Sequence, residues 1–283
     1  MENLETMGRD MGNALERTGS RRDALRGASL WGAGLMAATA PMLFSALAKK
    51  GYAQSTPTVL DVLQTLLNLE YLTSDFYAQG MAQAGLIPTS DRGIFGTLRD
   101  DEQAHADFLT QAVNNAGGTP APRPTFDFTA GGTYDPFGNY SDFQILSQAF
   151  EDLSVRAYKG AVSFLIANDA VLTAILTIHS VEGRHASEVR RLRGGFADLA
   201  PQKGWITQND RGTNMPASTQ PVYDAGTDPG AYPAENNVNQ GGINVSTLPG
   251  ANPTSGTEAF DEPLDASAVL NFLGPFIVSA PPS

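Results

Sequence analysis

Apolar side chains recur at helical spacing in four stretches of the chain, which are residues 58–84, 90–117, 141–167 and 170–199. Within each stretch leucine, valine, isoleucine or phenylalanine returns every three or four residues, so that one face of the helix is apolar. Each stretch is several helical turns long and is bounded by residues that commonly start or stop helices. The pattern predicts four α-helices that together form one domain over residues 54–200.

The connections between these helices predict how the helices are paired. Pro88 lies in the turn after the first helix and stops any helix there. Ser90 or Asp91 can cap the second helix, and Asn168 can cap the fourth. Two short connections make the first two helices antiparallel neighbours, and likewise the last two. Residues 117–138 are rich in glycine and proline and leave no room for a helix. Extended, such a segment reaches up to about 70 Å, so it can cross the whole length of a helix of about 39 Å.

Beyond Pro201 the composition changes to glycine, proline, asparagine, threonine and serine. We expect an irregular extension over residues 201–283, since few apolar residues occur before Phe260. Residues 260–265 then precede a short last helix that carries Val269, Phe272 and other apolar side chains. We expect this helix to pack on the four-helix domain.

Residues 1–53 look like an export signal. Arg21 and Arg22, followed by Leu25, resemble the twin-arginine motif, although Ala24 and Arg26 depart from its usual residues. The apolar run 27–48 follows, and small residues near Ala53 suit a signal peptidase. The segment predicts that the twin-arginine machinery exports the chain to the periplasm or to the outside of the cell. The alternative is an uncleaved membrane anchor, because the apolar run is just long enough to span a bilayer.

The net charge and the absence of cysteine argue against several binding partners and exclude several kinds of metal site. The formal net charge is −12, which argues against binding to nucleic acid or to anionic lipid surfaces. The chain has no cysteine, so disulfides, iron–sulfur clusters and Cys-x-x-Cys metal sites are excluded together. Any metal must therefore be bound by oxygen and nitrogen ligands.

Two copies of one motif carry the candidate chemistry. His105 stands three residues after Glu102, and His185 three residues after Glu182, so each pair lies on one face of its helix. A lone glutamate inside an apolar helical pattern precedes each motif, Glu70 by 32 positions in the first copy and its counterpart by 31 in the second. Buried carboxylates need cations or protons to neutralise them. The six candidate metal ligands are Glu70, Glu102, His105, Glu151, Glu182 and His185.

This arrangement resembles the di-metal carboxylate site of the ferritin-like superfamily, in which two helices each give a glutamate and two each give a Glu-x-x-His motif. The resemblance implies an all-α, ferritin-like four-helix bundle with a long crossover between its second and third helices. It also implies two iron or manganese ions, held by the six residues. Within the superfamily, the Gly/Pro-rich extension that follows residue 199 makes the chain most similar to exported proteins related to desiccation-related proteins.

Three further residues are candidates for positions around the metals. Tyr77 and Tyr158 each follow the lone glutamate of their half by seven residues, which is two turns along the same face. Each is either a core tyrosine with a satisfied hydroxyl or a redox or supporting group. His179 lies one turn before Glu182. It is either a surface histidine or a hydrogen-bond partner of a ligand carboxylate.

The resemblance leaves the reaction open, because one fold hosts many activities. The first hypothesis is an oxidoreductase that disposes of peroxide or oxidises ferrous iron under oxidative or desiccation stress, with oxygen or peroxide as the small oxidant. Ferroxidase, peroxidase and catalase-like activities all fit. The second is a non-catalytic stress or surface protein that keeps the bundle as a scaffold. The resemblance also leaves room for a homo-oligomer.

Overall fold

The computed structural model of the chain describes residues 57–194 and 202–278. The predicted export signal lies outside these residues. Four long helices dominate the described part: α4 (Val59–Ala82), α5 (Arg92–Asn115), α6 (Tyr140–Leu165) and α7 (Asp169–Gly194). The starts of all four helices and the ends of the first three agree with the periodic stretches to within two residues, whereas the predicted end of the fourth near residue 199 lies outside the described residues. The predicted all-α, ferritin-like bundle is confirmed.

Local side-chain contacts explain where these helices begin. Thr58 forms a capping box with Asp61 at the start of α4. The Asn168 side chain accepts a hydrogen bond from the Val171 amide at the start of α7. Asp91 stands at the start of α5 but makes no capping hydrogen bond with its side chain. Its carboxylate instead accepts from the Tyr140 hydroxyl at 2.6 Å, which ties the start of α5 to the start of α6.

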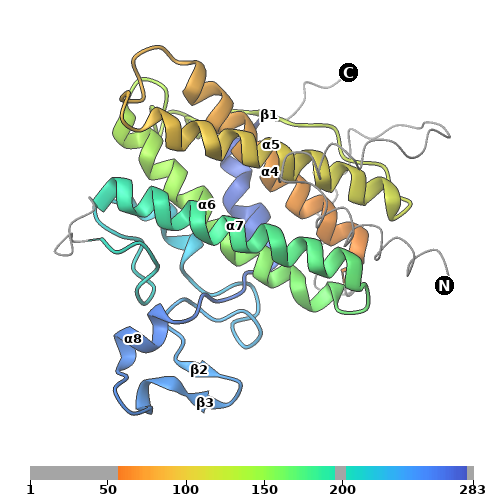
Figure 1. Cartoon of the computed structure of the whole chain (residues 1–283), viewed down its shortest axis with the longest axis vertical. Coiled ribbons are helices and arrows are strands. Elements are labelled where there is room, and N and C mark those ends of the chain that lie inside the picture. The colour runs from red at the N-terminus through yellow and green to blue at the C-terminus, as the bar shows by residue number, and fades with distance from the viewer. Residues whose placement is uncertain (1–56, 195–201, 279–283) are drawn as a thin grey trace, which may run out of the picture. The chain divides into compact units, whose positions relative to one another are not determined.

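The helices pack as two antiparallel pairs, α4 with α5 and α6 with α7 (Figure 1). Residues 116–139 connect the pairs as a long crossover, which contains strand β1 (Thr125–Phe126). β1 pairs antiparallel with β4 (Ile277–Val278) near the end of the described chain, with Thr125 opposite Val278. The Asp127 amide also donates to the Phe276 carbonyl at 2.8 Å. The crossover is therefore held by a segment about 150 residues further along the chain.

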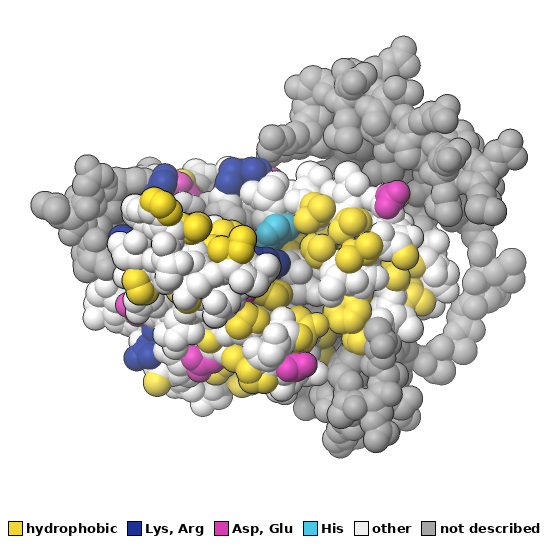
Figure 2. All heavy atoms as spheres, turned by 90° about the horizontal axis from the view of Figure 1, so that it is seen from below, with side chains coloured by type: hydrophobic (Ala, Val, Ile, Leu, Met, Phe, Trp, Pro, Cys, Tyr) yellow, Lys and Arg dark blue, Asp and Glu magenta, His cyan; other side chains and the backbone are white. Residues whose placement is uncertain are grey.

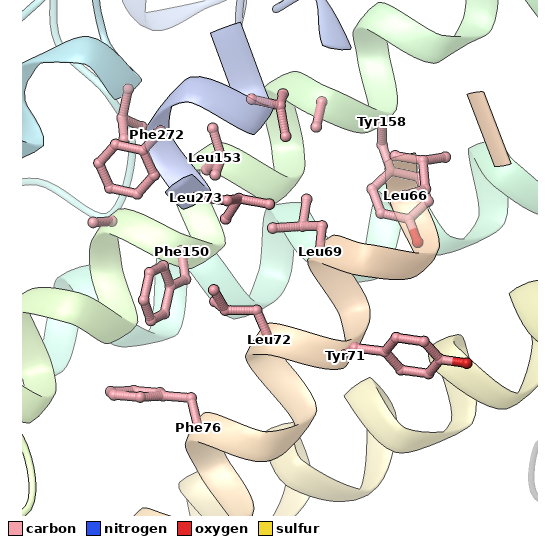
Figure 3. Close-up of a cluster of buried hydrophobic side chains, with 14 of the residues drawn as sticks. Leu66, Leu69, Tyr71, Leu72, Phe76, Phe150, Leu153, Tyr158, Phe272 and Leu273 are labelled. Carbon is pink, nitrogen blue, oxygen red and sulfur yellow. The ribbon is translucent and has the colours of Figure 1, made fainter. Parts of the chain in front are cut away.

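Helix α9 (Ala266–Leu273) lies against α4 and α6. Figure 3 shows Phe272 and Leu273 of α9 next to Phe150 and Leu153 of α6, with Leu69 of α4 nearby. All five of these side chains are buried. Each such side chain contributes about 1.5–3 kcal/mol when it is fully buried. The last helix thus closes the core between the two helix pairs.

The segment between α7 and α9 contains short elements that the sequence pattern did not predict. These are η2 (Ala217–Val222), the hairpin of β2 (Asn239–Gln240) and β3 (Ile243–Asn244), η3 (Val245–Thr247) and α8 (Pro253–Glu258), and η4 (Gly274–Phe276) follows α9. None is longer than six residues, so none repeats often enough to produce a periodic pattern.

Arg156 of α6 holds this segment on the bundle. Its side chain is fully buried and lies 2.8 Å from the Glu235 carboxylate. The same guanidinium donates to the carbonyl oxygens of Asp224 at 2.9 Å, Pro233 at 3.0 Å and Glu262 at 3.0 Å, as well as to that of Val222. Because one side chain reaches several loops, the extension is a packed part of the domain.

None of the helices in residues 57–194 and 202–278 combines the length and the apolar character that crossing a membrane requires.

Candidate metal centre

One carboxylate from each long helix reaches the middle of the bundle. Glu70, Glu102, Glu151 and Glu182 have no exposed surface. A buried apolar residue lies one turn away from each glutamate, so the amphipathic pattern that builds the core also buries the carboxylates; these residues are Leu66 on α4, Leu98 on α5, Val155 on α6 and Ile178 on α7. The acidic side chains visible on the face in Figure 2 are separate from one another, and none of them is a site glutamate, since those are fully covered.

The two histidines complete two overlapping groups of ligands. Glu70, Glu102, His105 and Glu182 offer ligand atoms within 4.8 Å of one another, and so do Glu102, Glu151, Glu182 and His185. Glu102 and Glu182 belong to both groups. The structure therefore brings all six predicted ligands to one place.

Distances at the two histidines match closely. His105 Nδ1 lies 2.9 Å from Glu182 Oε1, 3.6 Å from Glu70 Oε2 and 3.7 Å from Glu102 Oε2. His185 Nδ1 lies 2.8 Å from Glu102 Oε1, 3.5 Å from Glu151 Oε2 and 3.8 Å from Glu182 Oε2. The two halves of the bundle thus repeat each other around the site, with each histidine facing the glutamates of both halves.

Tyr77 and Tyr158 contact the site crosswise. The Tyr77 hydroxyl donates to Glu151 Oε1, and the Tyr158 hydroxyl donates to Glu70 Oε1. Burial, together with the charge of the glutamate each one contacts, raises the pKa of both tyrosines well above the usual value of 10.0. Both hydroxyls are therefore protonated donors, and each one fixes one oxygen of a candidate ligand.

Burial and mutual repulsion shift the pKa values of the carboxyl groups in different directions. Burial and the charge of Glu102 raise the pKa of Glu151 to about 8, and they also raise the pKa of Glu70 and that of Glu182. Burial acts in the same direction on Glu102, but its contacts with His105 and His185 hold its pKa well below 4.5. In the absence of a metal ion, protons must therefore neutralise part of this cluster.

Several buried ligand atoms make no hydrogen bond of acceptable geometry within residues 57–194 and 202–278, although each histidine Nδ1 lies 2.8–2.9 Å from a carboxylate oxygen. They are Glu70 Oε2, Glu102 Oε1, His105 Nδ1, Glu151 Oε2, both carboxylate oxygens of Glu182 and His185 Nδ1. Buried polar atoms without a partner are costly and rare in native proteins. Here they converge, and carboxylate oxygens with imidazole nitrogens are a donor set that suits iron and manganese. The residues present fit a pair of such ions.

His179 does not join this group. It is half-buried on α7, and its Nδ1 has no hydrogen-bond partner within the described residues. Burial lowers its pKa, and the charged groups that act on it are Asp261 and Lys159, not the site carboxylates. His179 therefore lies near both α6, which carries Lys159, and the C-terminal extension, which carries Asp261.

Two residues that contact the candidate ligands were not identified from the sequence. Thr73 Oγ1 donates to Glu102 Oε2 at 3.1 Å, and Asp101 Oδ2 lies 3.3 Å from His185 Nε2. Thr73 lies one turn after Glu70, and Asp101 directly precedes Glu102, so proximity to a ligand in the sequence was the available signal. Neither contact follows from spacing, because each one joins two different helices.

A buried ion pair supports the backbone beside Glu151. Arg190 of α7 donates to both carboxylate oxygens of Asp152 at 2.7–3.1 Å, and the Tyr223 hydroxyl donates to Asp152 Oδ2 at 2.6 Å. Bidentate pairs of this kind fix orientation as well as distance. The residue next to Glu151 is thus locked to both α7 and the C-terminal extension.

Comparison with known proteins agrees with this geometry. Residues 58–195 match the family model of the ferritin-like domain. The matched segment contains the four long helices and all six candidate ligands, which supports the ferritin-like superfamily for this part of the chain. No curated protein matches the chain.

Proposed function

We propose that the ferritin-like helices of this chain bind two iron or manganese ions and that the protein is an oxidoreductase. Glu70 and His105 would hold one ion, Glu151 and His185 the other. Glu102 and Glu182 belong to both groups of ligands and would bridge the two ions. The observation that carries this proposal is the convergence of seven buried oxygen and nitrogen atoms that have no hydrogen-bond partner among the described residues.

When bound, two such ions supply a two-electron change shared between them. The protein's own residues set the conditions for that change. The hydroxyls of Tyr77 and Tyr158 hold the outer oxygens of Glu151 and Glu70, so that the other oxygen of each glutamate faces the middle of the site. The surrounding core excludes water, which strengthens every charge interaction inside.

Peroxide and ferrous iron are the proposed substrates. Disproportionation converts two peroxide molecules into two water molecules and one dioxygen, and it needs no external reductant. Ferrous iron oxidation passes electrons from the iron substrate to dioxygen or peroxide. A peroxidase that needs a reductant would depend on an external donor, because the chain has no cysteine to build a rubredoxin-type electron-transfer centre.

The test is to load the purified protein with manganese or with iron and to assay both reactions. Manganese-loaded protein is expected to release dioxygen from peroxide without added reductant, or iron-loaded protein to oxidise further ferrous iron. Glu182→Gln, which alters a ligand common to both groups, should lose the activity. The exposed variant Asp107→Asn on α5 serves as the control. Metal-loaded protein that is inactive in both assays would contradict the oxidoreductase assignment.

One observation favours the second candidate function, a stress or surface protein that uses the bundle as a scaffold. The site is almost closed, since His105 is 8% exposed and His185 is 5% exposed. A small oxidant needs a path to the metals, and a scaffold does not. The amount of metal bound distinguishes the two candidate functions. Protein that is purified without chelators and then supplied with manganese or iron should bind neither metal if it is a scaffold.

We propose further that the chain is exported by the twin-arginine machinery. Arg21, Arg22 and the apolar run 27–48 support this proposal. They lie outside the residues that the structure describes. A location beyond the cytoplasm suits a protein that meets peroxide and ferrous iron from the surroundings of the cell.

A further inference from the structure

The inner contacts of the site repeat in the two halves, but the contacts around them do not. Around the two histidine Nδ1 atoms, the three corresponding distances differ by only 0.1 Å between the halves. Tyr77 and Tyr158 make equivalent contacts as well. Any difference between two bound ions must therefore come from residues further out.

The first difference is at the outer nitrogen of the histidines. Asp101 Oδ2 lies 3.3 Å from His185 Nε2, so this carboxylate accepts the Nε2 hydrogen and leaves Nδ1 free as a ligand. For His105, every carboxylate within 4.0 Å in the described residues is near Nδ1 and none is near Nε2. The position equivalent to Asp101 in the second half is Val181, directly before Glu182, and valine cannot accept a hydrogen bond.

The second difference is at the shared glutamates. Thr73 donates to Glu102 Oε2, which is the oxygen that faces His105, while Glu102 Oε1 faces His185. Donation to Oε2 reduces the electron density that this oxygen can offer to an ion beside His105. The equivalent residue in the second half is Ser154, whose buried hydroxyl has no partner within residues 57–194 and 202–278. Glu182 therefore receives no matching hydrogen bond.

Both differences act in the same direction. The carboxylate of Asp101 makes His185 a better-oriented and more basic ligand, and Thr73 weakens the Glu102 oxygen on the opposite side. Removal of an outer carboxylate of this kind costs about 10–100-fold in metal affinity in known sites. A difference of that size is large enough to separate two binding steps.

We propose that the two metal positions are unequal and that Asp101 makes the position of Glu151 and His185 the tighter one, which fills first. This inference rests on the proposed function, because it requires that the site binds two ions. Asp101 acts as a positioning residue, since within the described part of the chain it pairs with His185 and with none of the other five candidate ligands.

The experiment is an anaerobic titration of the full, metal-free chain with Mn²⁺, followed by calorimetry and by electron paramagnetic resonance. The wild type is expected to bind in two steps that differ by about 10-fold or more. Asp101→Ala should weaken the tight step by about 10–100-fold and leave the other step unchanged. Asp107→Ala, the same change on an exposed position of α5, should leave both steps unchanged.

A gain-of-function variant gives an independent test. Val181→Asp supplies His105 with the carboxylate that it lacks and should tighten the weaker step, so that the two steps approach each other. Unfolding of the metal-free variants by urea shows that each one is folded. Two identical steps in the wild type, or an unchanged tight step in Asp101→Ala, would overturn the inference and leave the proposed function intact. A wild type that binds no Mn²⁺ and no Fe²⁺ would instead overturn the proposed function.

Discussion

Tyr77 of α4 donates its hydroxyl hydrogen bond to Glu151 of α6, and so joins the two halves of the bundle at the candidate metal centre. Tyr158 of α6 returns the same contact to Glu70 of α4. Each half thus positions a ligand of the other half. The arrangement makes the packing of α4 against α6 a condition for the geometry of the site.

Replacement of either tyrosine by phenylalanine should weaken the site to the same extent. Tyr77→Phe and Tyr158→Phe each leave a buried carboxylate oxygen without its donor, which costs about 1–3 kcal/mol of stability. Both should also lower the affinity for Mn²⁺. Tyr71→Phe is the matched control on α4, because the Tyr71 hydroxyl contacts Thr110 at 3.3 Å, away from the site. Equal effects of Tyr77→Phe and Tyr71→Phe, measured by urea unfolding and Mn²⁺ titration, would refute a special role for the crossed contacts.

The metal-free protein should lose stability as the pH rises from about 6 to 8. The pKa of Glu151 is about 8 in the folded state against a usual value of 4.5, so between these values the folded state holds a proton that the unfolded state has released. Burial opposes protonation of His185, but contacts with Asp101 and Glu102 raise its pKa above 6.5. This shift also lowers the stability of the folded state as the pH rises. The lowered pKa of Glu102 makes stability fall again below about pH 4.5.

Bound metal should reverse this trend, because the ligands must release their protons before they bind. The stabilisation by Mn²⁺ is therefore expected to increase from pH 6 to pH 8. Urea midpoints with and without chelator at both pH values measure it. Glu151→Gln removes one titrating group and should flatten the metal-free pH dependence. A wild-type protein without metal that is equally stable at pH 6 and pH 8 would contradict these pKa shifts.

Arg156→Met should detach the C-terminal extension from α6. The change leaves Glu235 buried without its partner, and breaking a buried ion pair costs about 3–5 kcal/mol. The double variant Arg156→Met, Glu235→Gln should recover part of this loss, because it removes the unpaired charge. Arg99→Ala, at an exposed position on α5, is the control. Thermal unfolding measures the loss of stability, and limited proteolysis measures how well residues 202–265 are protected. Unchanged protection of that segment in Arg156→Met would exclude the anchoring role.

Export is expected to depend on the paired arginines. Arg21→Lys together with Arg22→Lys should leave the precursor in the cytoplasm, since lysine does not reproduce the guanidinium group that such a signal presents. Fractionation of cells that express the full chain measures the location. Replacement of Arg17 by lysine, four residues before the motif, is the control. An unchanged location in the double variant would point to another route or to no export.

The helices were predictable from local spacing, and the six candidate ligands from the repeated spacing together with its resemblance to the di-metal pattern of ferritin-like bundles. Glu70 and Glu151 lie within apolar helical patterns, and a Glu-x-x-His motif places two side chains on one helical face. Contacts between helices were not predictable. The contact between Asp101 and His185 joins residues 84 positions apart, and that between Arg156 and Val222 joins residues 66 positions apart. No local pattern encodes such pairs, and the same holds for the pairing of β1 with β4.

Metal content tests the central claim most directly. The full chain is purified without chelators, exposed to Mn²⁺ or Fe²⁺ without oxygen, desalted and subjected to elemental analysis. The wild type should retain two ions per chain. The double variant Glu102→Ala, His105→Ala should retain none, because it removes a shared ligand and one of the two histidines. Glu188→Gln on α7, which lies outside both groups, should bind like the wild type. Two ions retained in the double variant, or none in the wild type, would contradict the account.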